Sequence, residues 1–143
     1  DGLCRDADGR LASVVLDSSE LIRDRHYRHE KLLRHWLRHL ALQLACGPVH
    51  SLVIGKTGDV SFAPLERAAA AARIDDLLGA WAEGMRVPLP LPPLTAFAWL
   101  ARTPASPDGA PAGAAPDAVR EARLAYEGDG YKNEGECARC RVY

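Results

Sequence analysis

The fold is organised around residues 30–46, Glu30-Lys-Leu-Leu-Arg-His-Trp-Leu-Arg-His-Leu-Ala-Leu-Gln-Leu-Ala-Cys46. Apolar side chains recur there at steps of three and four, which predicts one apolar stripe along a helix of about 25 Å. The stripe consists of Leu33, Trp36, Leu37, Leu40, Ala41, Leu44 and Ala45. Gly47-Pro48 predicts the end of the helix, because glycine accepts a left-handed cap and proline cannot continue the hydrogen-bond ladder.

The opposite face of this helix is basic. It carries Lys31, Arg34, His35, Arg38 and His39. We therefore expect a core helix that buries its apolar stripe and presents its charge to a cleft or to a partner.

Composition limits the class of protein. The chain has 143 residues, 48% of them hydrophobic, and a formal net charge of −1. This predicts one folded domain with its own core and excludes disordered and fibrous classes. The net charge also excludes a uniformly basic nucleic-acid binder, but residues 21–39 hold six Lys/Arg against two acids, which is a local basic patch.

The sequence gives no sign of a membrane or secretory protein. It lacks an apolar run of the roughly 18 residues that span a bilayer and lacks a signal-peptide pattern. Four cysteines are few for a secreted scaffold of this size, so we expect a reducing, cytoplasmic setting. Because the chain starts at Asp1 without a methionine, we expect it to be a fragment of a larger protein.

Two hairpins flank the basic helix. Residues 3–16 carry strand-like apolar residues around the turn Asp6-Ala-Asp-Gly9, and residues 51–62 carry them around Gly55-Lys-Thr-Gly-Asp59. Pro64 opens a second long helix over residues 65–83, with an apolar stripe. That stripe consists of Ile74, Leu77, Leu78 and Trp81. The predicted fold class is α/β: a small mixed sheet from two hairpins, packed by two long helices.

The last third of the chain is less regular. Val87-Pro-Leu-Pro-Leu-Pro-Pro93 must be extended, either as a strap over the domain's own surface, which we favour, or as a ligand for a proline-binding module. Thr95 is expected to cap a short helix, and residues 117–126 form another. Residues 102–116 are expected to be a flexible Ala/Pro/Gly loop within a single domain spanning 1–143.

Three short motifs are weak on inspection. Gly55-Lys-Thr57 lacks the first glycine of a phosphate-binding loop, since His50 occupies its position. His35 and His39 could share a metal at i, i+4 spacing, but a solvated basic face is the favoured interpretation. Cys137 and Cys140 have zinc-like spacing, yet a structural zinc site needs two more ligands. We expect no metal and no cofactor.

The order of segments resembles the PD-(D/E)xK nucleases of the RecB type, and more specifically the C-terminal domain of RecC, the gamma subunit of exodeoxyribonuclease V (the RecBCD helicase–nuclease). The resemblance rests on Asp1-Gly-Leu3, Leu11-Ala-Ser-Val-Val-Leu-Asp17, Arg34-His-Trp-Leu-Arg-His-Leu-Ala-Leu42, Phe62-Ala-Pro-Leu65, Trp81-Ala-Glu-Gly-Met85 and Pro88-Leu-Pro-Leu-Pro-Pro93, then Ala122-Arg123, Tyr126-Glu-Gly128 and Gly135-Glu136. It covers nearly the whole chain and implies a restriction-endonuclease-like core.

The resemblance also implies where catalytic groups would stand. An active member needs an acid on the first strand and (D/E)-x-K on the second, to hold Mg²⁺ and position water. Asp1 matches the first acid, whereas Val15 falls at the second acid and Asp17 at the lysine. The QxxxY pair of active relatives becomes Arg34-x-x-x-Arg38. The expected site, Asp1, Val15 and Asp17, is therefore degenerate, with no catalytic residue.

The resemblance thus implies an inactive domain that supports assembly and DNA strand guiding in double-strand-break repair, with RecB-like and RecD-like helicase subunits and DNA as partners. Arginine suits phosphate because its guanidinium offers paired donors and stays charged. The expected DNA-binding residues are Arg25, Arg28, Lys31, Arg34 and Arg38. Two alternatives stay open: an active Mg²⁺-dependent nuclease using Asp1 and Asp17, and a protein-docking module without DNA contact.

Overall fold

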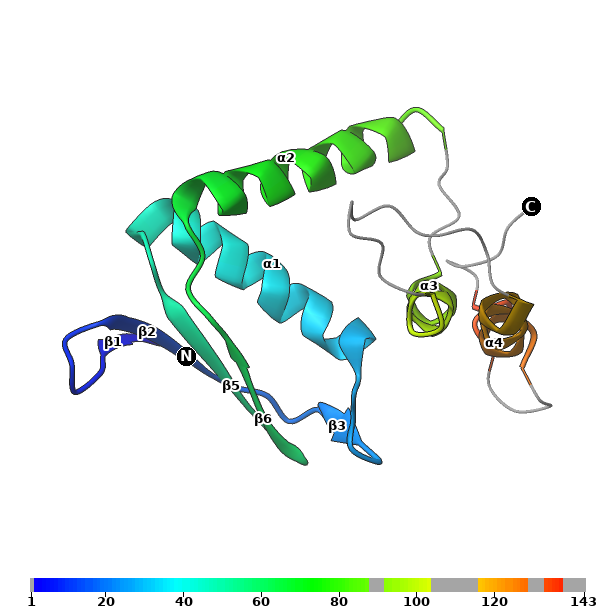
Figure 1. Ribbon diagram of the computed structural model, residues 1–143, viewed down its shortest axis with the longest axis horizontal. Helices are drawn as coiled ribbons and strands as arrows, with labels where there is room; N and C mark the ends of the chain where they lie inside the picture. The colour runs from blue at the N-terminus through cyan, green and yellow to red at the C-terminus, as the bar shows by residue number, and fades with distance from the viewer. Residues whose placement is uncertain (1, 88–91, 104–115, 129–132, 138–143) are drawn as a thin grey trace. The chain divides into compact units, whose positions relative to one another are not determined.

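The structure is a computed structural model that describes residues 2–87, 92–103, 116–128 and 133–137 (Figure 1). The chain divides into two compact units, residues 1–87 and 88–143. The first unit contains β1 (Gly2–Arg5), β2 (Leu11–Leu16), β3 (Ile22–Arg23), β4 (His26–Tyr27), α1 (His29–Cys46), β5 (His50–Gly55), β6 (Gly58–Phe62) and α2 (Arg67–Gly84). The second contains α3 (Pro93–Leu100) and α4 (Pro116–Glu127).

A four-stranded mixed sheet forms the base of the first unit. Its order is β1-β2-β5-β6. The outer pairs are antiparallel hairpins, and the central pair, β2 and β5, is parallel with Ala12 opposite His50 and Leu16 opposite Ile54. A parallel pair needs a crossover connection, and α1 supplies it (Figure 1). The predicted mixed sheet built from two hairpins is confirmed; β3 and β4 form a further small hairpin that the sequence did not predict.

The turns explain why these strands pair in this register. Asp6 Oδ1 accepts hydrogen bonds from the backbone N–H groups of Asp8 (3.0 Å) and Arg10 (2.8 Å), which closes the β1–β2 turn. In the β5–β6 turn, Thr57 Oγ1 donates to the carbonyl of Ile22 at 2.7 Å and accepts from its N–H at 3.2 Å. Thr57 therefore ties this hairpin to β3. The turn predicted within residues 55–59 is confirmed, with Gly55 paired to Gly58.

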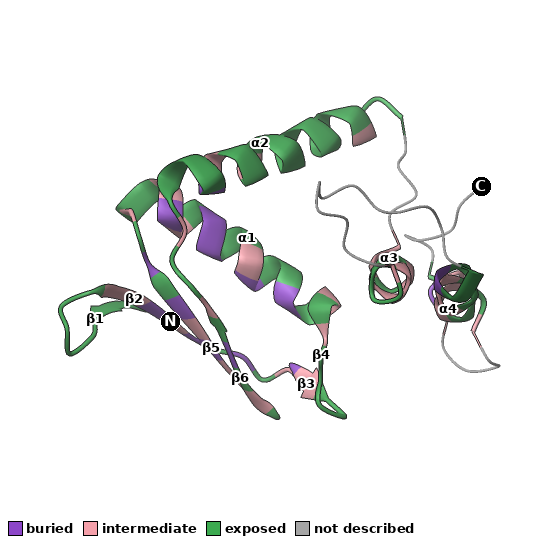
Figure 2. Ribbon diagram, in the orientation of Figure 1, coloured by how far each residue is buried: buried purple, intermediate pink, exposed green. Residues whose placement is uncertain are grey.

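One face of the sheet is buried under α1 (Figure 2). Strand side chains alternate between faces, so Ser13 and Val15 of β2 point to the buried side together with Val53 of β5. The apolar core in this layer consists of Leu21, Leu32, Val53 and Val60, with Ile22 and Phe62 packed against it.

The buried face of α1 differs from the predicted one. Its buried residues are Leu32, His35, His39, Leu40 and Gln43. Of the predicted apolar stripe, Leu40 is buried, but Leu33 and Leu37 are 40% and 45% exposed and two alanines of the stripe are exposed too. The predicted stripe is therefore wrong in its angular position around the helix.

Buried polar side chains of α1 are tolerated because they have partners. His39 Nδ1 lies 2.8 Å from Ser51 Oγ. The Gln43 side chain donates to the carbonyl of Val49 at 2.7 Å and accepts from the N–H groups of Val49 at 3.1 Å and Leu65 at 3.2 Å. Gln43 thus joins the end of α1 to the segments that enter β5 and α2.

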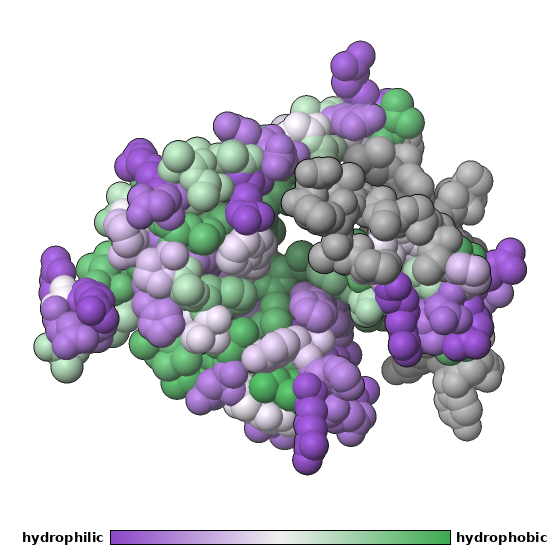
Figure 3. All heavy atoms as spheres, viewed as in Figure 1, coloured by the Kyte–Doolittle hydropathy of each residue, from purple (hydrophilic) through white to green (hydrophobic). Residues whose placement is uncertain are grey.

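Helix α2 is largely exposed, with Ala70 in its first half as its buried residue. Ala70 is fully buried, whereas Leu77, Leu78 and Trp81 of the predicted apolar stripe are exposed. Burial of that stripe was therefore wrongly predicted. Figure 3 shows hydrophobic residues scattered among hydrophilic ones over the surface of this unit.

In the second unit, a distant carboxylate caps α3. Glu134 Oε1 accepts from the N–H of Leu94 at 3.0 Å, and Oε2 accepts from the N–H and hydroxyl of Thr95 at 2.8 and 2.9 Å. Thr95 is therefore a donor inside the first turn, not the predicted cap. Most of the predicted 102–116 loop, the middle of the Pro-rich strap and Cys140 lie outside the described residues.

Candidate nucleic-acid interface

A cavity of about 310 Å³ lies where β2 ends beside α1. It is lined by Val15, Leu16, Arg34, His35 and Arg38. Strand β1 pairs with β2 only as far as Val14, so among the described residues the edge of β2 has no strand partner beyond that point. The cavity therefore lies at the end of β2, with two arginines of α1 beside it.

The two arginines lie one helical turn apart. Arg34 and Arg38 are four residues apart in α1, which places them on the same face of the helix. Both are exposed, and the Arg34 side chain retains 66% of its accessible surface. The cavity thus has a positively charged side that solvent can reach.

A buried carboxylate lies behind them. Asp17 follows β2 directly and its side chain is 3% exposed. Its Oδ1 accepts from the N–H of Ser19 at 2.8 Å, while Oδ2 accepts from Arg34 Nη2 at 2.5 Å and lies 2.6 Å from His35 Nε2. The Arg34 hydrogen bond holds the pKa of Asp17 far below its usual range, with His35 and Ser19 adding to this and burial opposing it. Asp17 is therefore a carboxylate whose charge is satisfied inside the protein.

The structure brings together some of the predicted site residues and separates others. Val15 lines the cavity beside Arg34 and Arg38, and Asp17 is bonded to Arg34; Asp1 lies outside the described residues. Arg25, Arg28 and Lys31 are not among the residues that line the cavity.

Two of these three outlying residues have clear local settings. Arg25 sits at the tip of the β3–β4 turn with a φ of 65°, and Arg28 pairs with Glu20 at 3.3 Å and Glu30 at 2.8 Å. Glu20 also binds Arg23, and that hydrogen bond lowers its pKa. Arg28 is therefore part of a local ion-pair network that the sequence did not reveal.

His35 is the site residue that sequence analysis missed. Both His35 and His39 were expected on a solvated face, but both are buried, because each has a polar partner on the sheet side. These partners differ, Asp17 for His35 and Ser51 for His39. Within the described ranges, no group of three or more His, Cys, Asp or Glu side chains could hold a metal ion. Nothing in helical spacing alone distinguishes a buried, paired histidine from an exposed one.

His39 belongs to an aromatic cluster between α1 and β6. Its ring lies 5.5 Å from that of Trp36 and 5.4 Å from that of Phe62, and the Arg73 guanidinium of α2 lies 5.9 Å from the Trp36 ring centre. Burial lowers the pKa of His39, the nearby charge of His50 adds to this, and a hydrogen bond with the backbone of Ala63 opposes it.

The lowered pKa of His39 makes stability depend on pH. The folded state keeps His39 neutral, whereas the unfolded chain takes up a proton near the ordinary histidine value, so stability should fall as the pH drops below about 6.5. Urea unfolding of the 143-residue chain at several pH values should show this loss. The variant His39→Gln should lose less stability on acidification, while His26→Gln, at an exposed position, should behave as the wild type. Equal acid sensitivity in His39→Gln and the wild type would contradict this interpretation.

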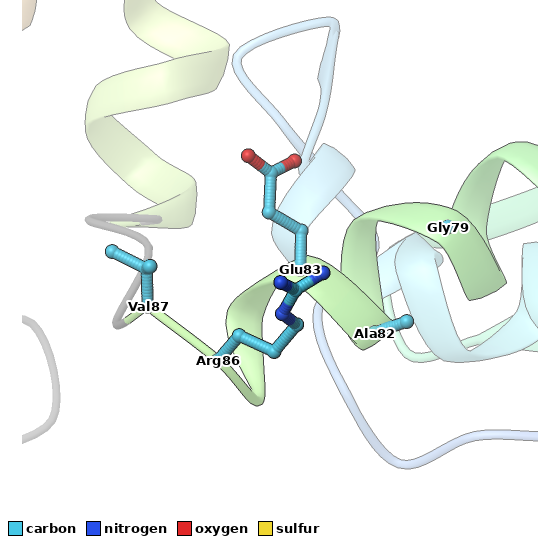
Figure 4. A pocket seen from close by; sticks show the side chains of 5 residues that line it. All are labelled: Gly79, Ala82, Glu83, Arg86 and Val87. Atoms are coloured by element: carbon cyan, nitrogen blue, oxygen red, sulfur yellow. The ribbon is translucent and has the colours of Figure 1, made fainter.

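A second hollow has a different character. It is lined by Gly79, Ala82, Glu83, Arg86 and Val87 (Figure 4). All five belong to the last turns of α2 and the residues that follow, so among the described residues this hollow brings no distant parts of the chain together. The cavity at the end of β2 is the stronger candidate, because it joins residues of a strand and a helix and includes Arg34, which is paired with Asp17.

Comparison with known proteins points to one family. The family model described as the RecC C-terminal domain matches residues 4–103. No curated protein matches the chain. In the part of the chain that the structure describes, no helix combines the length and apolar character that crossing a membrane requires.

Proposed function

The chain belongs to the RecC C-terminal domain family, and from this premise we propose that it is a non-catalytic, nuclease-like domain that supports assembly and DNA strand guiding. RecC is the gamma subunit of exodeoxyribonuclease V, the RecBCD complex of DNA repair and recombination, in which other subunits carry the enzymatic activity. RecB-like and RecD-like subunits and DNA are accordingly the partners we propose. A cytoplasmic location remains a prediction.

The observation that carries the proposal is the composition of the cavity at the end of β2. Magnesium in a nuclease site needs carboxylate oxygens that are open to it. Val15 offers no donor, and both oxygens of Asp17 already have partners in Ser19, Arg34 and His35. Among the described residues, Val15 and Asp17 therefore do not fit the metal that an active nuclease requires, which supports the non-catalytic assignment.

The order of elements supports the proposed restriction-endonuclease-like core. A β1–β2 hairpin leads into α1, and β5 then returns parallel to β2. We also propose that residues 1–143 act as one nuclease-like domain, because the family match runs across the boundary between the two compact units.

Binding to DNA would use the positive side of the cavity. Guanidinium groups give phosphate oxygens two parallel hydrogen bonds, and each phosphate they neutralise releases a counterion. Arg34 and Arg38 are exposed on one helix face beside the end of β2, where the backbone of a DNA strand could reach both.

The test is the salt dependence of DNA binding. We expect Arg34→Ala/Arg38→Ala to reduce the slope of log affinity for a single strand against log salt by about 0.7 for each phosphate that the variant no longer neutralises. The measurement is fluorescence anisotropy of a labelled single-stranded oligonucleotide at about 50 to 200 mM salt. Arg67→Ala/Arg86→Ala, which removes the same charge from exposed positions on and after α2, is the matched control.

Three results would argue against strand guiding. A wild-type slope in the Arg34/Arg38 variant would remove the proposed DNA contact. Retained pull-down of a RecB-type subunit without any DNA binding would favour the docking module. Cleavage of DNA in Mg²⁺ or Mn²⁺ by the purified chain would favour the active nuclease.

A further inference from the structure

We propose that Asp17 withholds Arg34 from DNA, so that this buried carboxylate sets how strongly the cavity takes a phosphate group. The inference rests on the proposed DNA binding and adds a determinant of affinity to it. It begins from one ion pair, in which Arg34 Nη2 donates to Asp17 Oδ2 at 2.5 Å.

The Arg34 guanidinium is held toward the protein although most of its surface is accessible. Besides the bond from Nη2 to Asp17, its Nε lies 3.3 Å from His35 Nε2. Two of its three nitrogens therefore face polar groups of the protein, while the side chain remains 66% exposed. A phosphate that approaches Arg34 meets a cation already paired with an anion.

Asp17 is a fixed competitor. It is held by Ser19 and His35 as well as by Arg34, and only 3% of its side chain is exposed, so it cannot swing away. Asp17 and a phosphate would compete for the same guanidinium. The phosphate therefore gains less binding free energy from Arg34, because a charge that is already neutralised releases few counterions. The positive charge that the cavity offers to a phosphate is therefore smaller than the sum of its two arginine charges.

Neutralising Asp17 should strengthen DNA binding. Asp17→Asn keeps the side-chain shape; its oxygen can still accept from Ser19 and its amide can donate to His35. We expect affinity for the single-stranded oligonucleotide to rise about threefold, from the removal of one negative charge near a phosphate in a high dielectric. The salt slope should steepen by about 0.7, because Arg34 then neutralises a phosphate of its own on the single strand.

A matched control separates this local effect from net charge. Asp76→Asn makes the same charge change at an exposed position of α2 and should leave both affinity and slope as in the wild type. An equal gain in Asp76→Asn would overturn the inference. So would unchanged or weaker binding by Asp17→Asn.

A second variant keeps the inference testable should Asp17→Asn fold poorly. If Asp17 withholds Arg34, then Arg34→Ala alone reduces the salt slope less than Arg38→Ala does, and most of the reduction in Arg34→Ala/Arg38→Ala comes from the loss of Arg38. If Arg34→Ala alone flattens the slope as much as Arg38→Ala does, Arg34 already binds phosphate and the inference fails while DNA binding stands. If the double variant keeps the wild-type slope, the proposed function itself fails.

Discussion

Replacing Gln43 with leucine is expected to lower the free energy of unfolding by about 3 kcal/mol or more. The substitution removes hydrogen bonds to three backbone groups, the N–H and carbonyl of Val49 and the N–H of Leu65. Val49 is fully buried, so water cannot replace these bonds without opening the structure. Each buried group left without a partner costs about 1 to 3 kcal/mol.

Urea unfolding of the 143-residue chain, followed by circular dichroism, would measure the destabilisation, and hydrogen exchange of the β2 and β5 amides would assign it to the first unit. Ala45→Leu is the control, since it places leucine at an exposed position of the same helix and removes no hydrogen bond of the side chain. Nearly equal midpoints for Gln43→Leu and the wild type would mean that Gln43 does not join α1 to its neighbours as described.

Leu40→Ala is expected to cost about 2 to 5 kcal/mol, and Leu37→Ala less than about 1 kcal/mol. Leu40 is fully buried, so its truncation removes apolar packing and leaves a cavity, whereas Leu37 is 45% exposed. The same unfolding measurement compares the two variants directly. Both leucines belong to the apolar stripe that the sequence predicts, so equal costs would favour the predicted stripe over the buried face of the structure.

Local signals predicted most elements correctly. Gly47 has a φ of 85° and ends α1 one residue after Cys46, as the Gly-Pro pair indicated. The Asp6–Gly9 turn and the turn at residues 55–58 join antiparallel strands as expected. Such signals depend on neighbours in sequence, because turns and helix ends are set by the backbone preferences of a few adjacent residues.

The orientation of α1 could not be predicted in the same way. Its buried face includes His35, His39 and Gln43, whose partners Asp17, Ser51 and Val49 lie on or beside the strands. From sequence alone a polar residue is predicted to be exposed, because the hydrogen-bond partner that permits its burial is not known. The apolar residues that alternate with them were assigned to the core on hydrophobicity alone, and much of that assignment was wrong.

The candidate site was predicted in part for the same reason. Arg34 and Arg38 share a helix face by their spacing alone, and the cavity brings them together with Val15. Arg28 could not be separated from them in sequence, because its ion pairs with Glu20 and Glu30 depend on the path of the chain through β3 and β4. The bond between Asp17 and His35 joins residues 18 positions apart and needed the folded sheet.

The parallel pairing of β2 with β5 has a consequence for the order in which this domain assembles. The β1–β2 and β5–β6 hairpins each join strands that are neighbours in sequence and close a short loop. Pairing of β2 with β5 instead requires closure of the long loop formed by residues 17–49. Contacts between residues that are distant in sequence form slowly, and the β2–β5 pairing also needs α1 packed against the sheet. Since the cavity is made from the end of β2 and one side of α1, it comes into existence only at that late step. Nascent chains with both hairpins formed would still lack the surface that we propose for DNA binding.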